Sequence, residues 1–107
     1  MDIPPILTTS QIRRSMITKD LLIFLFYYRD GDLYWRVPPA ITVDISKPAG
    51  SVNGGGFREV RINKNRYRVD LLVWIYFNGA VPDGFVIKHK DENKLNSRVE
   101  NLKLYER

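Results

Sequence analysis

The sequence predicts an α+β fold, in which a small antiparallel sheet packs on two or three helices and a hairpin follows at the C-terminal end. Two apolar runs, 18–28 and 70–78, have the boundaries of helices. Between them, 33–69 contains alternating apolar and polar residues interrupted by glycine and proline, which is typical of short strands. Beyond them, 86–106 begins and ends with short apolar stretches that flank a loop rich in asparagine, aspartate and serine.

Size and composition indicate one folded domain, 1–107. With 107 residues, 44% of them hydrophobic and 12% aromatic, the chain is long enough for one modest core. It has no cysteine and one histidine, which excludes disulfides and leaves too few of the usual ligands for a zinc site. The lack of cysteine suits a reducing compartment, and no basic stretch leads into an apolar signal segment. We therefore expect a cytoplasmic protein without a membrane anchor.

The positive charge is concentrated in two segments. The net charge is +5, yet residues 1–35 hold four basic and four acidic side chains. Residues 58–68 hold five basic side chains against one acidic, and residues 86–107 hold six against four. A local excess of this kind favours an anionic partner, and double-stranded DNA is the partner we expect.

The first part of the chain is expected to be helical. Ser10 predicts the cap of a short helix that contains Ile12 and Met16. Thr18 predicts the N-cap of a second, buried helix over 18–28, and a turn at 30–32 ends it. A short buried strand is the alternative for this apolar run, because periodicity does not separate the two.

The next part, 33–69, is expected to form a basic antiparallel sheet. A strand starts at Leu33, and the triple glycine at 54–56 is interpreted as a turn, since no Lys-Ser or Lys-Thr pair follows it as in a phosphate-binding loop. The segment 57–62 alternates and returns after a turn at 63–65. Its basic side chains are predicted to contact phosphates, the alternative being an ordinary charged face; they are Arg58, Arg61, Lys64, Arg66 and Arg68.

A third helix, 70–78, is predicted with Asp70 as its cap and Gly79 at its end. Its apolar residues, including Leu71 and Phe77, are expected in the core. The side chains expected to be mostly buried are Trp35, Val60, Ile62, Tyr67, Leu72, Trp74, Ile75, Ile87 and Leu102.

The last segment brings the only histidine, His89, to the end of a short strand. The loop after it can hold its path through side-chain hydrogen bonds to its own backbone. Asn96 or Ser97 is expected to cap one helical turn, 98–101, before a second strand over 102–105.

This segment resembles the HNH endonucleases, whose fold is also called the His-Me finger, and in particular the small phage enzymes of the homing-endonuclease type. Those proteins carry a histidine, then a loop similar to Asp-Gly-Asn-x-x-Asn-Asn-Arg, then Glu-Asn-Leu. The run 31–35 is similar to their aromatic strand, so the resemblance spans most of 21–107. The matching residues are His89, Asp91, Asn93, Asn96, Arg98, Glu100, Asn101 and Leu102.

The resemblance implies roles for His89 and Asn101. His89 matches the general base that activates water, and Asn101 matches the asparagine that braces the loop. A divalent cation, magnesium or manganese, is implied if the protein is active. Relatives carry a ligand, Asp or Asn, where this chain has Lys88, and a second ligand on a helix beyond Asn101 that we do not expect here. The metal ligands are therefore unknown, and the expected hairpin, 86–106, lacks the final helix.

The sequence departs from relatives at one further place. They commonly show His-Arg-Leu-x-Trp where this chain has Asp70-Leu71-Leu72-Val73-Trp74. The apolar anchors are kept and the polar pair is not.

Three functions are consistent with these observations. The first is a phage DNA-binding protein of the HNH type with weak or lost nuclease activity, located in the host cytoplasm. The second is an active metal-dependent nicking endonuclease, and the third is a phage protein that binds a host protein. The DNA-binding residues expected in the C-terminal segment are Lys88, Lys90, Lys94 and Arg98.

Overall fold

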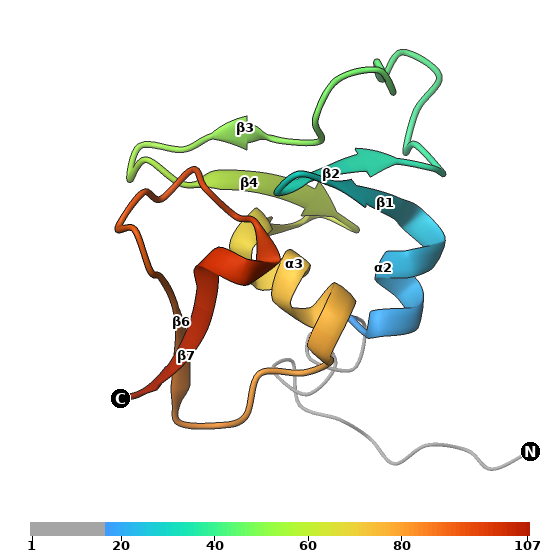
Figure 1. Ribbon diagram of the computed structural model, residues 1–107. Helices are drawn as coiled ribbons and strands as arrows, with labels where there is room; N and C mark the ends of the chain where they lie inside the picture. Colours follow the sequence, from blue (N-terminus) through green and yellow to red (C-terminus); the bar gives the residue numbers. More distant parts are fainter. Residues whose placement is uncertain (1–16) are drawn as a thin grey trace, which may run out of the picture.

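The computed structural model describes residues 17–107, so the helix expected around Ile12 lies outside the described residues. The predicted α+β class is confirmed, with small antiparallel sheets around a central helix (Figure 1). In chain order the elements are α2 (Lys19–Leu25), β1 (Phe26–Arg29), β2 (Asp32–Trp35), β3 (Ser51–Val52), β4 (Arg58–Ile62), β5 (Asn65–Arg68), α3 (Val69–Asn78), β6 (Phe85–His89), the 3-10 helix η1 (Val99–Asn101) and β7 (Leu102–Glu106).

Helix α2 begins as predicted and ends early. The Thr18 hydroxyl accepts a hydrogen bond from the Leu21 N–H at 3.1 Å, which confirms the cap. The prediction that the helix continues to Tyr28 is wrong, because Phe26–Arg29 forms strand β1 and pairs with β2. The rings of Phe26 and Trp35 lie 4.3 Å apart across this pair. Aromatic side chains favour such cross-strand contacts on a pleated surface, and here they outweigh the helical pattern.

The hairpin turn between β1 and β2 requires its glycine. Asp30 and Gly31 both have positive φ, 49° and 91°, as a tight two-residue hairpin turn demands. A Cβ on Gly31 would also lie 2.9 Å from the backbone nitrogen of Arg98. The turn therefore packs closely on the loop before η1.

The expected single sheet over 33–69 is instead divided. Strands β1 and β2 form one hairpin, and β3, β4 and β5 form a separate three-stranded sheet. Strand β2 pairs with β1 along one edge. In addition, the Leu33 carbonyl accepts a hydrogen bond from the Ala49 N–H at 2.7 Å. The predicted β4–β5 hairpin is confirmed, but its turn is shorter than the predicted 63–65, because Asn65 already pairs with Ile62.

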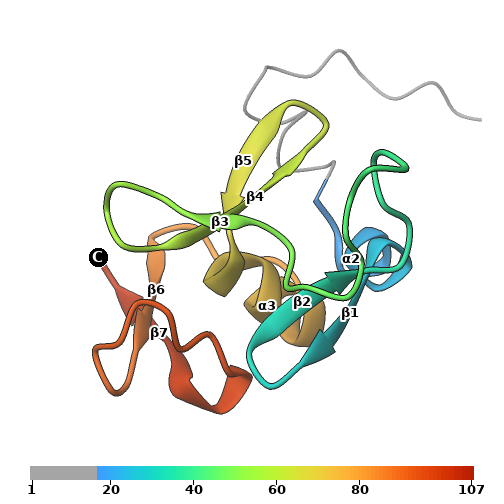
Figure 2. The ribbon, with the colours of Figure 1, turned by 90° about the horizontal axis from the view of Figure 1, so that it is seen from above.

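Helix α3 lies at the centre, between the β6–β7 hairpin, the three-stranded sheet and α2, as both ribbon views show (Figures 1 and 2). It is apolar on nearly all sides, which is typical of a helix surrounded by protein. Its end at Gly79 is confirmed, with φ at 81° and the Gly79 N–H bonded to the Ile75 carbonyl. The prediction of Asp70 as its cap is wrong: Arg68 holds the cap position, and Asp70 lies in the first turn.

The predicted core is largely confirmed. Most of the expected residues are buried, and Tyr67, Trp74 and Ile87 are half-buried against the same cluster. Phe77 is 40% exposed, contrary to prediction, because it lies in the last turn of α3 and packs edge-on against Tyr28 near the surface. Within the described residues, no helix is long and apolar enough to cross a membrane.

Replacing Phe26 by alanine is expected to lower the free energy of unfolding by about 3–5 kcal/mol, because a fully buried ring is lost from the core. Phe24 is 62% exposed, so Phe24→Ala is the matched control, with an expected change below about 0.5 kcal/mol. Urea denaturation followed by tryptophan fluorescence measures both. Equal losses for the two variants would contradict this packing.

Candidate active site and nucleic-acid interface

His89 lies in a closed position between the C-terminal hairpin and the start of α3. It is the last residue of β6 and pairs with Leu102 of β7, so its side chain shares the inward face of the hairpin with Ile87. The His89 side chain is 6% exposed, and its Nε2 lies 3.4 Å from the Oδ2 of Asp70. The ring of Phe57 lies 6.2 Å away. The histidine is thus placed beside a carboxylate that the sequence analysis assigned to helix capping.

Asp70 is a buried carboxylate with three donors of its own. Its side chain is 2% exposed and accepts hydrogen bonds from the Nε and Nη2 atoms of Arg68 and from the Leu71 N–H. The Arg68 guanidinium lies 3.6 Å from the centre of the Phe57 ring, which fixes its plane. Sequence reasoning missed this pair. The available signal was that Asp70 is the only charged residue within α3.

Asn101 closes the loop between β6 and β7. Its Nδ2 donates to Asp91 at 2.9 Å and to the Asn96 carbonyl at 2.8 Å, while its Oδ1 accepts from the Asp91 N–H at 3.2 Å. Its backbone carbonyl accepts from the Lys90 N–H at 2.8 Å. Asn101 therefore joins both ends of the loop beside His89, where the sequence predicted a brace.

Asp91 is the acceptor at the centre of this loop. Hydrogen bonds from the Asn96 side chain, the Asn93 N–H and the Asn101 side chain lower the pKa of Asp91 from 3.8 to about 2. The expected helical turn after the loop is the 3-10 helix η1, with Arg98 rather than Asn96 or Ser97 at its cap position. The Val99 N–H donates to the Tyr28 hydroxyl, which ties η1 to β1.

The carboxylates around His89 do not fit a divalent cation. Within residues 17–107, no group of three or more histidine, aspartate or glutamate side chains is placed to hold a metal ion. Asp70 is bonded to Arg68, and Asp91 is bonded to three loop donors. Lys88 is exposed and lies on the opposite face of β6 from His89, and an ammonium group has no lone pair to offer a cation.

The basic residues predicted on the β4–β5 hairpin do not form one free surface. Arg61 and Arg66 are exposed and lie directly opposite each other, and Lys64 is exposed in the turn between them. Arg58 donates to the Gly50 carbonyl at 3.1 Å, while Arg68 is held by Asp70. Three of the five basic side chains, Arg61, Lys64 and Arg66, are therefore exposed near the tip of the hairpin.

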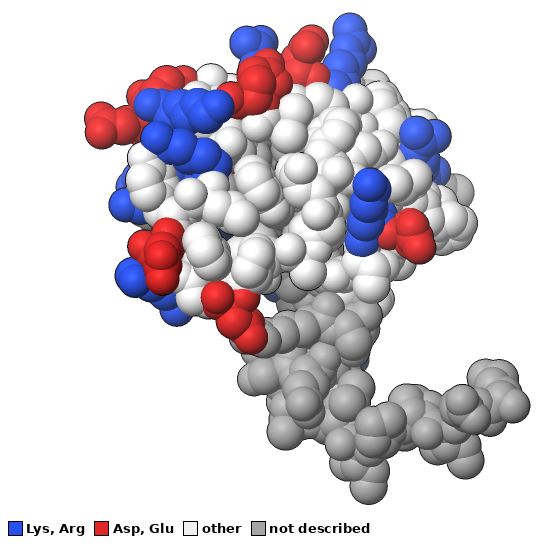
Figure 3. Space-filling model, turned by 60° about the horizontal axis from the view of Figure 1, so that its bottom comes forward, with Lys and Arg blue, Asp and Glu red and all other residues white. Residues whose placement is uncertain are grey.

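The basic residues of the C-terminal segment lie on different sides of it. Lys88 lies 4.9 Å from the centre of the Tyr105 ring, on the outward face of the hairpin. Lys94 donates to the Gly55 carbonyl at 3.0 Å and lies 5.0 Å from the Phe57 ring, close to the His89 position. Lys90 and Arg98 are exposed. Figure 3 shows the molecule with the bottom of Figure 1 turned forward. On this face, a broad uncharged centre is bordered by both basic and acidic side chains.

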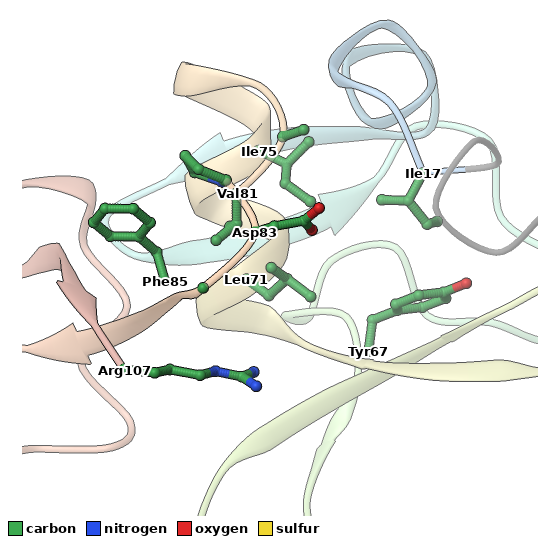
Figure 4. Close-up of a pocket in the computed structure, with 11 residues that line it drawn as sticks. Ile17, Tyr67, Leu71, Ile75, Val81, Asp83, Phe85 and Arg107 are labelled. Carbon is green, nitrogen blue, oxygen red and sulfur yellow. The ribbon is translucent and has the colours of Figure 1, made fainter. Parts of the chain in front are cut away.

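The described cavities lie away from His89. One of about 650 Å³ is lined mainly by apolar side chains, including Leu71 and Phe85, together with Arg107 (Figure 4). Phe85 is at the opposite end of β6 from His89. A second cavity, of about 350 Å³, lies beside β3 and is lined by Arg61 and Arg66 among others.

The C-terminal hairpin thus presents one histidine beside a loop that is braced by an asparagine. Residues 67–107 match the family model described as HNH endonuclease. The match includes Asp70, His89 and Asn101 and confirms the resemblance for the C-terminal segment; for 21–66 the resemblance stays a prediction. No curated protein and no solved structure matches the chain. The family implies a nucleic-acid substrate and a nuclease-like function, and its members typically depend on a metal ion.

Asp91→Asn is expected to destabilise the protein at neutral pH, because both carboxylate oxygens accept hydrogen bonds and an NH₂ group in place of either one cannot accept. The folded-state pKa of Asp91 is depressed from 3.8 to about 2, so its stabilising contribution is present above pH 3.8 and is lost as the pH falls to about 2. Urea denaturation at several pH values should show the difference from wild type shrinking over this interval. The exposed carboxylate at the end of β7 provides the control, Glu106→Gln. A difference that is independent of pH would contradict this role.

Proposed function

We propose that this chain is a phage DNA-binding protein of the HNH endonuclease type whose nuclease activity is weak or lost. One observation carries the proposal: the histidine and its bracing loop are retained, while the carboxylates nearest to them are occupied by the protein's own donors. The segment therefore keeps the family's framework without the acceptors that a cation needs.

The consequence for catalysis follows from the size of each contribution. A positioned general base typically contributes about 10²–10⁴-fold to a rate. A bound cation stabilises transition-state charge by several kcal/mol, and about 1.4 kcal/mol corresponds to a factor of ten in rate. A chain with His89 but without a cation site is thus expected to cleave DNA several orders of magnitude more slowly than a complete enzyme.

Binding is proposed to rest on phosphate contacts. Arg61, Lys64 and Arg66 are exposed at the β4–β5 hairpin, and Lys94 lies near Phe57 and His89. Contacts of arginine and lysine with phosphates carry no direct sequence information, so the affinity should depend on salt and little on sequence. Lys88, Lys90 and Arg98 are proposed to add further contacts from the C-terminal segment.

An active nicking endonuclease is the second candidate. The observation that favours it is the retained pair of His89 and Asn101 within the matched segment. Such an enzyme would need Asp91 and Glu92 in another arrangement, or ligands from a second subunit, to complete its cation site.

Reversing the charge of the hairpin, as Arg61→Glu with Arg66→Glu, is expected to weaken binding to duplexes of any sequence. If about five phosphates are contacted, log K for wild type should fall with log salt with a slope of about −4 to −5, and the variant should show a shallower slope. Fluorescence anisotropy over a range of salt concentrations measures both quantities. The matched control is Lys19→Glu with Lys47→Glu, which changes the net charge equally at positions outside the hairpin.

If the control pair weakens DNA binding equally, the loss of affinity is due to net charge alone, and the hairpin is not part of the interface. Wild-type affinity indifferent to salt would contradict the proposal and favour a protein partner instead.

A further inference from the structure

The Nε2 atom of His89 is a buried polar atom without a hydrogen bond to any described residue. Buried polar side-chain atoms are rarely left in this state, so its surroundings are informative. The Asp70 carboxylate lies beside it, with its Oδ2 3.4 Å away. This distance is slightly longer than the roughly 2.7–3.2 Å of an ordinary N–H···O hydrogen bond, and contacts at catalytic sites often tighten only when substrate binds.

The chemistry of the two groups allows one favourable arrangement. A neutral imidazole carries a proton on one nitrogen and a lone pair on the other. The Asp70 carboxylate offers only acceptor oxygens, which already receive three hydrogen bonds, two from Arg68 and one from the Leu71 N–H. A proton on Nε2 is attracted to Oδ2, whereas a bare Nε2 would place its lone pair against a lone pair of Oδ2 at a buried position.

We propose that Asp70 is a positioning residue for His89. It holds the imidazole in the tautomer with the proton on Nε2 and so leaves Nδ1 as the atom that accepts a proton from water or another donor. The role of His89 as a base rests on the proposed function, but its tautomer does not.

The geometry that supports this role comes from three separate elements. Asp70 is fixed in the first turn of α3, and His89 is fixed at the end of β6. Arg68, at the end of β5, holds the carboxylate with two hydrogen bonds while its guanidinium packs on Phe57. The carboxylate therefore has little freedom to rotate away from the imidazole.

Nitrogen-15 NMR of the full chain, produced without added histidines, tests the proposal directly. The protein has one histidine, so the imidazole signals need no assignment, and long-range proton–nitrogen correlations show which nitrogen carries the proton. At about pH 9, where an ordinary imidazole is neutral, wild type should show the proton on Nε2. Asp70→Asn should reverse the pattern, because the new amide can donate to a bare Nε2. The control, Asp44→Asn, makes the same charge change in an exposed loop and should leave the wild-type pattern.

A wild-type spectrum with the proton on Nδ1 would overturn the proposal, and so would an Asp70→Asn variant with the wild-type pattern. If Asp70→Asn does not fold, the wild-type spectrum alone decides. The measurement contains no DNA, so a failure of DNA binding leaves its result intact.

Discussion

The burial of α3 is the constraint on which the rest of the structure depends. Leu72 and Val73 are fully buried, and the helix contacts α2, β2, β4, β5 and η1, so the β1–β2 hairpin and the three-stranded sheet both pack against it. The two-stranded hairpins β1–β2 and β6–β7 are too small to be stable alone. Because Asp70 belongs to the first turn of this helix, the same packing that builds the core fixes the carboxylate next to His89.

The acidic groups near His89 serve the protein's own donors. Asp70 accepts hydrogen bonds from Arg68, and Asp91 accepts hydrogen bonds from two asparagine side chains and a backbone N–H. A carboxylate used in this way stabilises the local fold, but it has few lone pairs left for a cation. The histidine and the braced loop of an HNH segment are therefore retained. The Asp70 and Asp91 carboxylates, however, are occupied by hydrogen bonds and are not free to bind a metal ion.

Local signals in the sequence predicted the features that depend on local interactions. Thr18 and Gly79 marked helix ends, the alternation at Val60 and Ile62 gave the core face of β4, and the resemblance placed His89 and Asn101 together. The end of α2 was missed, because the aromatic run from Phe26 onward satisfies either a helix or a strand until its partner β2 is known. The contacts of Asp70 were missed since they depend on the approach of β6 to α3, which no sequence pattern specifies.

The central claim is that the His89 site lacks a competent cation site, and plasmid nicking tests it most directly. Supercoiled plasmid would be incubated with wild type and with His89→Ala in magnesium and, separately, in manganese, and the nicked form measured over time. Wild type is expected to nick no faster than the variant in either metal. Robust metal-dependent nicking by wild type that His89→Ala abolishes would contradict it, and would show that Asp91, Glu92 or a second subunit completes the site.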